Sequence, residues 1–582
     1  MNNKYLLKLR QVLIIAMSVF VLTFAGSAQT ESARIQGSVT DANSSVVPGA
    51  NITIRDQGTG REVKTTANDE GFYSVLSLQP GRYDIEVTQA NFKTTKQEVT
   101  LEVAQTAVLN FVLETGAVSE TVTVTTDTPL VETASSSIGE VIQGREAVEL
   151  PLNGRNVLEL ARLTPGVTQG IPGGFASGVS GNAETYRARN TGGAALSVNG
   201  QRTQANNFLL DGVDNNESLV NTINVFPSAE AIQELRLQAS AAAAEHGRGG
   251  GGIINSVIKS GTNQFHGSGF GFFRNDNRDA RPTFETTKRD FRRDQFGGTL
   301  GGPIVKNRAF FFTDYEGLNQ TLPVSQDFAS VPTAGFRTGN FSALNQQLRD
   351  PLTGQNICVT GTTTNGILCS NGNGVAFNRL DLLPGNRLNA VGLRYLQAFP
   401  LPNFSANPFR QNFVSTRNEV TSTDTFDIRG DVSLTQNHQM FGRYSWGKFR
   451  QTTTSRLPDL PAGFGSGTNP TDTRGAVVGL TSLFSSKIVN EFRIQANRIR
   501  FGYTPPFFDR AISADLGIPN ANRDASLGGG ALIGGFNGDL EYTGDFGPYL
   551  VPQSTYQIVD SVSYTAGDHI FKFGGTILRR DV

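Results

Sequence analysis

The stretch that decides the fold reads GIINSVIKSGTNQFHGSGFGFFRND over Gly252–Asp276 and DQFGGTLGGPIVKNRAFFF over Asp294–Phe312. Short segments of aromatic and aliphatic residues are separated by glycines, and the apolar residues do not recur at a helical spacing. Glycine inside a strand usually marks a bend or a close approach of two backbones. This stretch therefore predicts a β-sheet that is bent into a curved wall.

Downstream segments alternate apolar and polar residues with the period of two that a strand requires. In Thr425–Leu434 the residues Phe426 and Ile428 fall on one face, whereas Asp427 and Arg429 fall on the other. The segment Glu491–Asn497 repeats the alternation. An apolar face toward lipid and a polar face toward a lumen is typical of a transmembrane β-barrel, although a soluble sandwich also alternates.

The connections separate these two folds. Short turns at 435–439, 485–487 and 566–568 alternate with long loops at 318–421, 451–472 and 502–554, which is typical of bacterial barrels. Strands are expected near 266–274, 293–302, 308–316, 424–434, 438–449, 474–484, 487–500, 555–565 and 569–579. Because bacterial barrels close with even strand numbers and plugged transporters have about 22 strands, we expect the chain to be the front part of a longer barrel.

Several phrases carry a family resemblance. KSGTNQFHGS followed by DQFGGTLGGPI, with ELPLNGRN, VNGQRTQANNFLLDGVDNN, EAIQELRLQ and GGGIINSVIKSGTN before them, resembles TonB-dependent outer-membrane receptors of the Oar-like type. The resemblance implies an α+β plug over 140–262 and a transmembrane barrel with long external loops over 263–582. It also implies location in the cell outer membrane, with the N-terminal domain and the plug on the periplasmic side.

The N-terminal region predicts a signal peptide and a small sandwich. Residues 1–28 combine a basic start, an apolar core and small residues at Gly26–Ala28, as secretory signals do. Residues 29–116 contain about seven short segments divided by turn signals, which favours a β-sandwich. The phrases GSVTD, VPGANITI, DEGFYSV and LQPGRYDIEV resemble the carboxypeptidase regulatory-like domain, a transthyretin-like sandwich, which we interpret as a periplasmic spacer or docking module.

The composition excludes several function classes. The net charge is −1 and only 17% of residues are charged, so nothing favours binding of nucleic acid. The four histidines are scattered and neither HExxH nor GxSxG occurs, so we predict no catalytic residues, no cofactor and no enzyme activity. Asp211, Asp214, Asn215 and Asn216 match no calcium-loop spacing and are expected to form turns, with metal binding as the alternative.

The linker at 117–139 contains ETVTVTT, that is Glu120, Thr121, Val122, Thr123, Val124, Thr125 and Thr126. This segment looks like a TonB box, through which such receptors contact the energising protein of the inner membrane. Alternating Val and Thr favour an extended backbone, which can add as a strand to a partner's sheet edge. The alternatives are a last strand of the sandwich or a plain linker.

Two cysteines, Cys358 and Cys369, lie in the longest loop. In an exported protein a close pair predicts a disulfide that closes a small ring, and two unpaired thiols are the alternative. The resemblance implies partners as well: a TonB-type energy-transducing protein, outer-membrane lipid, a small-molecule or oligosaccharide ligand such as a siderophore, and a possible surface lipoprotein. A surface, adhesion or secretion-linked protein without nutrient uptake is the competing hypothesis.

Overall fold

The computed structural model describes most of residues 32–582. Outside its description lie 1–31, 125–137, 170–195, 360–366, 370–374, 383–387, 522–539 and shorter gaps. The expected signal peptide falls outside the described residues. Within the described part of the chain, no helix has the length and apolar character to cross a membrane.

The N-terminal domain, here called the sandwich, consists of two facing sheets around one apolar core that includes Ile35, Ile52 and Tyr83. One sheet has the order β3-β2-β5-β6-β9, and in the other β1 pairs with β4, β7 and β8. The strands are β1 (Ala33–Asp41), β2 (Asn51–Asp56), β3 (Glu62–Thr66), β4 (Phe72–Leu78), β5 (Gly81–Thr88), β6 (Thr94–Leu101), β7 (Thr106–Val108), β8 (Phe111–Leu113) and β9 (Thr121–Val124). The predicted sandwich is confirmed, and β9 extends its sheet beyond residue 116.

The second unit, the plug, is mixed α and β. Its main sheet has the order β10-β15-β16-β13-β14, and β11 pairs with β12. The elements are β10 (Ile138–Gln143), α2 (Gly144–Glu149), β11 (Val167–Gln169), β12 (Leu196–Val198), β13 (Asn207–Leu210), β14 (Val213–Asp214), β15 (Ile232–Ser240) and β16 (Ile253–Ile258). A 3₁₀ helix spans Val157–Leu163, where Asn156 accepts a hydrogen bond from the amide of Leu158.

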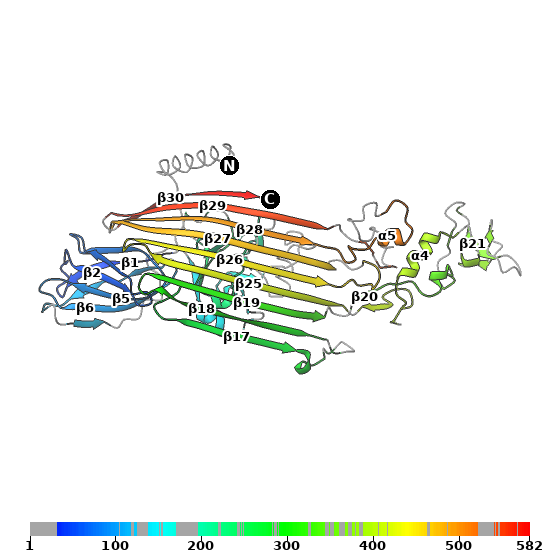
Figure 1. The fold of residues 1–582 in the computed structure, drawn as a ribbon, viewed down its shortest axis with the longest axis horizontal. Helices are drawn as coiled ribbons and strands as arrows, with labels where there is room; N and C mark the ends of the chain where they lie inside the picture. Colours follow the sequence, from blue (N-terminus) through cyan, green and yellow to red (C-terminus); the bar gives the residue numbers. More distant parts are fainter. Residues whose placement is uncertain are drawn as a thin grey trace.

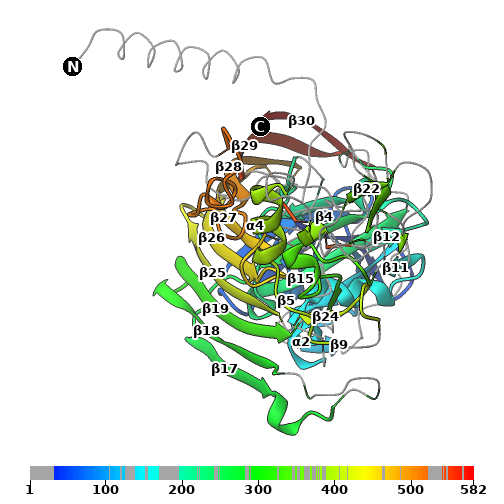
Figure 2. The ribbon, with the colours of Figure 1, turned by 90° about the vertical axis from the view of Figure 1, so that its right-hand side faces the viewer.

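The third unit, the wall, is a nine-stranded antiparallel sheet in which successive strands are neighbours. Its strands are β17 (His266–Asn275), β18 (Arg292–Val305), β19 (Ala309–Pro323), β25 (Asn418–Ser433), β26 (His438–Thr453), β27 (Gly467–Ser485), β28 (Ile488–Tyr503), β29 (Tyr549–Ala566) and β30 (His569–Asp581). Each predicted strand is present, although several are longer than expected. Figure 2 shows the wall curving around the plug.

Alternation along the wall separates two faces as predicted. In β25, Asp427 and Arg429 are buried against the plug, whereas Ile428 is exposed on the outer face. In β28, Glu491 and Arg493 are buried whereas Ile494 is exposed. The polar face therefore lines the interior and the apolar face is available to lipid.

Glycines allow the close packing that the sequence predicted. A Cβ built on Gly261 would lie 2.3 Å from the carbonyl oxygen of Phe311 and 2.7 Å from that of Gly302. Since real Cβ atoms do not approach that closely, only glycine fits where the plug passes into the wall.

The two ends of the wall differ, and we call them the short-turn end and the long-loop end. The sandwich lies at the short-turn end, and the loop elements around α4 lie at the opposite end (Figure 1). There β20 (Asp327–Ala329), β24 (Phe413–Ser415), α4 (Ala390–Ala398) and α5 (Ile512–Asp515) contribute to a separate apolar core. The long loops are thus folded on one another into a cap.

The cysteines lie on two paired strands of this cap, β21 (Asn356–Val359) and β22 (Ile367–Cys369), and β21 also pairs with β23 (Val375–Ala376). Cys369 is opposite Asn356, and Cys358 is opposite Ile367. The two cysteines are therefore diagonal neighbours in the backbone register, while their side chains lie outside what the structure describes. The disulfide stays a prediction.

Candidate functional site

The plug is fixed to the wall by a buried charge cluster that starts at Asp211. This residue follows β13, has φ +50° and is fully buried. Its carboxylate accepts hydrogen bonds from Arg429 (3.2 Å) and Arg443 (2.5 Å) of the wall and from the amide of Ile258 (3.0 Å). Arg429 also pairs with Asp431 at 2.9 Å. Buried ions of both signs thus satisfy each other across the interface.

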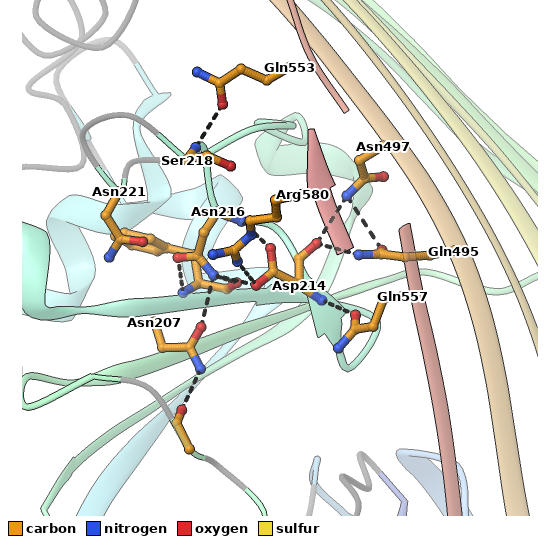
Figure 3. Close-up of polar contacts among 12 residues, drawn as sticks. Asn207, Asp214, Asn216, Ser218, Asn221, Gln495, Asn497, Gln553, Gln557 and Arg580 are labelled. Atoms are coloured by element: carbon orange, nitrogen blue, oxygen red, sulfur yellow. Dashed lines mark hydrogen bonds and ion pairs between the residues drawn. The ribbon is translucent and has the colours of Figure 1, made fainter. Parts of the chain in front are cut away.

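Three residues further on, Asp214 makes a second anchor (Figure 3). Its amide donates to Gln557 at 2.8 Å, and its carbonyl oxygen accepts from Gln495 (2.7 Å) and Asn497 (3.0 Å). Its carboxylate pairs with Arg580. Burial raises the pKa of Asp214, and the positive charge of Arg580 opposes this shift.

Two hydroxyl groups add further links between plug and wall. Ser228 donates to Asp314 and Ser260 donates to Asp431, each at 2.7 Å. Apolar contact accompanies these links, since Phe312 of the wall packs with Leu210 of the plug. The plug is therefore held by polar groups whose partners lie on the wall, so that moving it requires breaking buried pairs.

The Asp and Asn side chains of this segment serve as structural contacts. Asn216 donates to Asn207 (2.8 Å), and Asn215 donates to the carbonyl oxygen of Val225 (2.8 Å). Among the described residues no group of three or more His, Cys, Asp or Glu is placed to hold a metal. The sequence identified the segment but not its wall partners. The signal for these was the row of charges on the interior face of β25.

The coupling segment, defined as Glu120–Thr126, is described only over β9, in its backbone. Here Thr121–Val124 pairs in parallel with Thr94–Gln97 of β6, at the edge of the sandwich sheet. This is the arrangement expected of a last sandwich strand, the alternative noted above. An edge strand can also be exchanged for another strand, so a coupling role stays a prediction.

The sandwich is held to the plug by two side chains of β15. Glu234 accepts a hydrogen bond from the amide of Val103 at 2.6 Å, and Arg236 donates to the carbonyl oxygen of Val103 at 2.5 Å. Burial raises the pKa of Glu234 to about 8; Glu102 adds to this shift and Arg236 opposes it. We call this contact the clasp.

A small cavity of about 80 Å³ lies between plug and wall, nearer to the long-loop end. Arg155, Phe226, Thr425, Asp427 and Phe449 are among its lining residues. Ligand sites usually occupy about 300–1,000 Å³, so in this conformation the cavity is a crevice with polar and aromatic walls.

The chain matches two family models. Residues 257–582 match the outer membrane beta barrel domain, and residues 34–114 match the carboxypeptidase regulatory-like domain. The TonB-dependent transporter Oar of Myxococcus xanthus is 26% identical over 312 residues, which are 50% of this chain and 27% of that protein. The chain thus spans about a quarter of the length of this relative.

Two solved structures show distant overall likeness. A mutant of the ferric enterobactin receptor PfeA from Pseudomonas aeruginosa is 12% identical, with a TM-score of 0.41 over 76% of this chain and 49% of that one. The outer membrane transporter YddB from Escherichia coli is 10% identical, with a TM-score of 0.37 over 76% of this chain and 56% of that one. Because the barrel model matches more than half of its residues, this chain, a homologue of Oar located in the cell outer membrane, belongs to the outer-membrane β-barrel family.

Proposed function

We propose that this chain forms the receptor and plug part of a TonB-dependent importer. A ligand such as a siderophore or an oligosaccharide binds from outside, and a TonB-type protein pulls the coupling segment. The plug then rearranges inside the wall and admits the ligand. The observation that carries the proposal is the position of β9, an edge strand that precedes a plug held by the buried pairs of Asp211 and Asp214.

An edge strand suits the coupling step. Parallel pairing with β6 leaves the other edge of β9 without a partner among the described strands, so an incoming strand can add there or replace β6. The domain limits that we predicted, including the linker at 117–139, stay a prediction; β9 pairs within the sandwich sheet and β10 of the plug begins at Ile138. Catalysis has no part in the proposal, which rests on binding and movement alone.

The test joins cross-linking to uptake. Val122→Cys should form a disulfide with a cysteine-scanned TonB-type protein in energised cells, and a protonophore should abolish it. Deleting residues 120–126 should abolish uptake from a panel of radiolabelled ferric siderophores and oligosaccharides. Scrambling residues 128–134 is the control and should leave uptake intact. Unchanged uptake after the deletion would refute the proposal.

The competing function, a surface or adhesion role, is favoured by one observation. The long loops form a cap with its own apolar core, including Tyr395, Phe399 and Ile512, and such a cap offers a stable surface for contact with a macromolecule or a surface lipoprotein. Cells that lose attachment but keep uptake when the cap is deleted would support this role.

A further inference from the structure

A second cavity lies at the short-turn end, between the sandwich, the plug and the wall. It measures about 620 Å³, which is within the range of ligand sites. The turn between β2 and β3, residues 57–61, forms part of its boundary. That turn is anchored where the plug passes into the wall, since the amide of Asn263 donates to the carbonyl oxygen of Gly58 at 2.9 Å.

The charged groups around this cavity are unbalanced. Its lining includes four arginines but only two aspartates. The arginines are Arg61 and Arg82 of the sandwich and Arg429 and Arg493 of the wall. Arg429 is already neutralised by Asp211 and Asp431. On the sandwich side, Arg61 and Arg82 face a single aspartate of the lining, Asp56.

Arg61 is the informative residue. Its Nε and Nη2 atoms are buried and have no hydrogen-bond partner. Asp56 also lines the cavity, but its Oδ1 atom accepts hydrogen bonds from the backbone amides of Gly58 (2.8 Å) and Thr59 (3.2 Å). Burial lowers the pKa of Arg61, and Tyr83 and Asp56 oppose this shift.

Buried N–H groups of a guanidinium that lack acceptors are costly, and in native structures such groups call for an explanation, of which a bound anion is one. The planar fork of an arginine matches the oxygen atoms of a carboxylate or a phosphate. We propose that this cavity is a periplasmic chamber that binds an oxyanion through Arg61. This proposal rests on the proposed import function, and it assigns an acidic group, a carboxylate or a phosphate, to the ligand that leaves the plug.

The experiment uses the purified protein in detergent, titrated by calorimetry with inorganic phosphate in one arm and citrate in the other. Wild type should bind at least one of them below millimolar concentration, and Arg61→Gln should weaken that binding at least about tenfold. Arg61→Lys should fall between the two, because it keeps the charge and loses the fork. Arg55→Gln, on the exposed part of β2, is the matched control and should bind as wild type does.

Thermal unfolding without added anion gives a second readout. Because Arg61→Gln removes two buried guanidinium nitrogens that lack acceptors, its melting temperature should equal or exceed that of wild type. Weaker binding by this variant would then not result from lost folding. The proposal would be overturned if wild type bound neither anion, if Arg61→Gln bound as tightly as wild type, or if Arg61→Gln and Arg55→Gln lost affinity equally. The titration needs no energised membrane, so it can fail while import holds, and import can fail while it holds.

Discussion

Asp211→Asn is the substitution whose effect the structure defines most sharply. Arg429 retains Asp431 when the Asp211 charge is removed, but Arg443 keeps only the hydroxyl of Ser445 as a hydrogen-bond acceptor in the described structure. One buried guanidinium is thus left without its carboxylate. Breaking a buried pair in this way costs about 3–5 kcal/mol, and an amide that still accepts one hydrogen bond places the variant near about 3 kcal/mol.

Hydrogen exchange of the plug measures this cost. About 3 kcal/mol corresponds to a rise of roughly two orders of magnitude in the opening equilibrium of β13 and β16, the strands next to Asp211. Asp294→Asn is the control, because its partner Arg292 is largely exposed and such pairs contribute about 0–1 kcal/mol. The double variant Asp211→Asn/Arg443→Gln should recover part of the loss, since no cation is stranded. Exchange equal to wild type, or a double variant at the full sum of both losses, would refute the reasoning.

Three further predictions concern other contacts. Glu234 has a pKa raised from 4.5 to about 8 by burial. Between these pH values its carboxyl group is therefore protonated when the sandwich is docked and ionised when it is undocked. Docking should therefore be strongest below about pH 4.5 and weaken as the pH rises through 8. Distances between spin labels placed at Lys64 and Lys487 should report this change. Distances that do not depend on pH, or a pH response that remains in Glu234→Gln, would contradict the prediction. Gly261→Ala should destabilise the junction of plug and wall by about 2 kcal/mol or more, which urea unfolding measures. Gly269→Ala is the control and should leave the midpoint unchanged, because a Cβ there meets no atom within 4 Å. Equal midpoints for the two variants would exclude the close approach at Gly261. Reduction should raise the intact mass by two hydrogens if Cys358 and Cys369 are bridged, and local unfolding of the cap should become easier by about 2–4 kcal/mol; alkylation of the unreduced protein at both thiols would exclude the bridge.

The wall could be predicted because its signal is local. The alternation in 425–434 and 491–497 can be recognised within a single strand. The glycines of 297–302 indicate close packing whichever strand is the partner. The partners of the plug could not be predicted in the same way. Arg429 lies 218 residues from Asp211, and a lumen-facing arginine shows no preference for one distant carboxylate over another.

The clasp could not be predicted from the sequence for a different reason. Glu234 and Arg236 bind the backbone of Val103, and a backbone amide or carbonyl leaves no trace in residue identity. The 3₁₀ geometry at Val157–Leu163 could not be predicted either, because its apolar spacing fits either kind of helix. Local sequence patterns thus predict the helices and strands, whereas contacts between domains through main-chain atoms are found only in the structure.

The coupling segment is connected to the clasp through β10. A pull on β9 would first separate it from β6, and residues 125–137 extend to at most about 45 Å before the load reaches β10. Strand β10 pairs with β15, where Gln143 is opposite Glu234 and Val141 is opposite Arg236. Removing β10 therefore exposes the backbone that holds both clasp residues. If the coupling segment is pulled as proposed, we expect rearrangement of the plug to weaken the clasp as well.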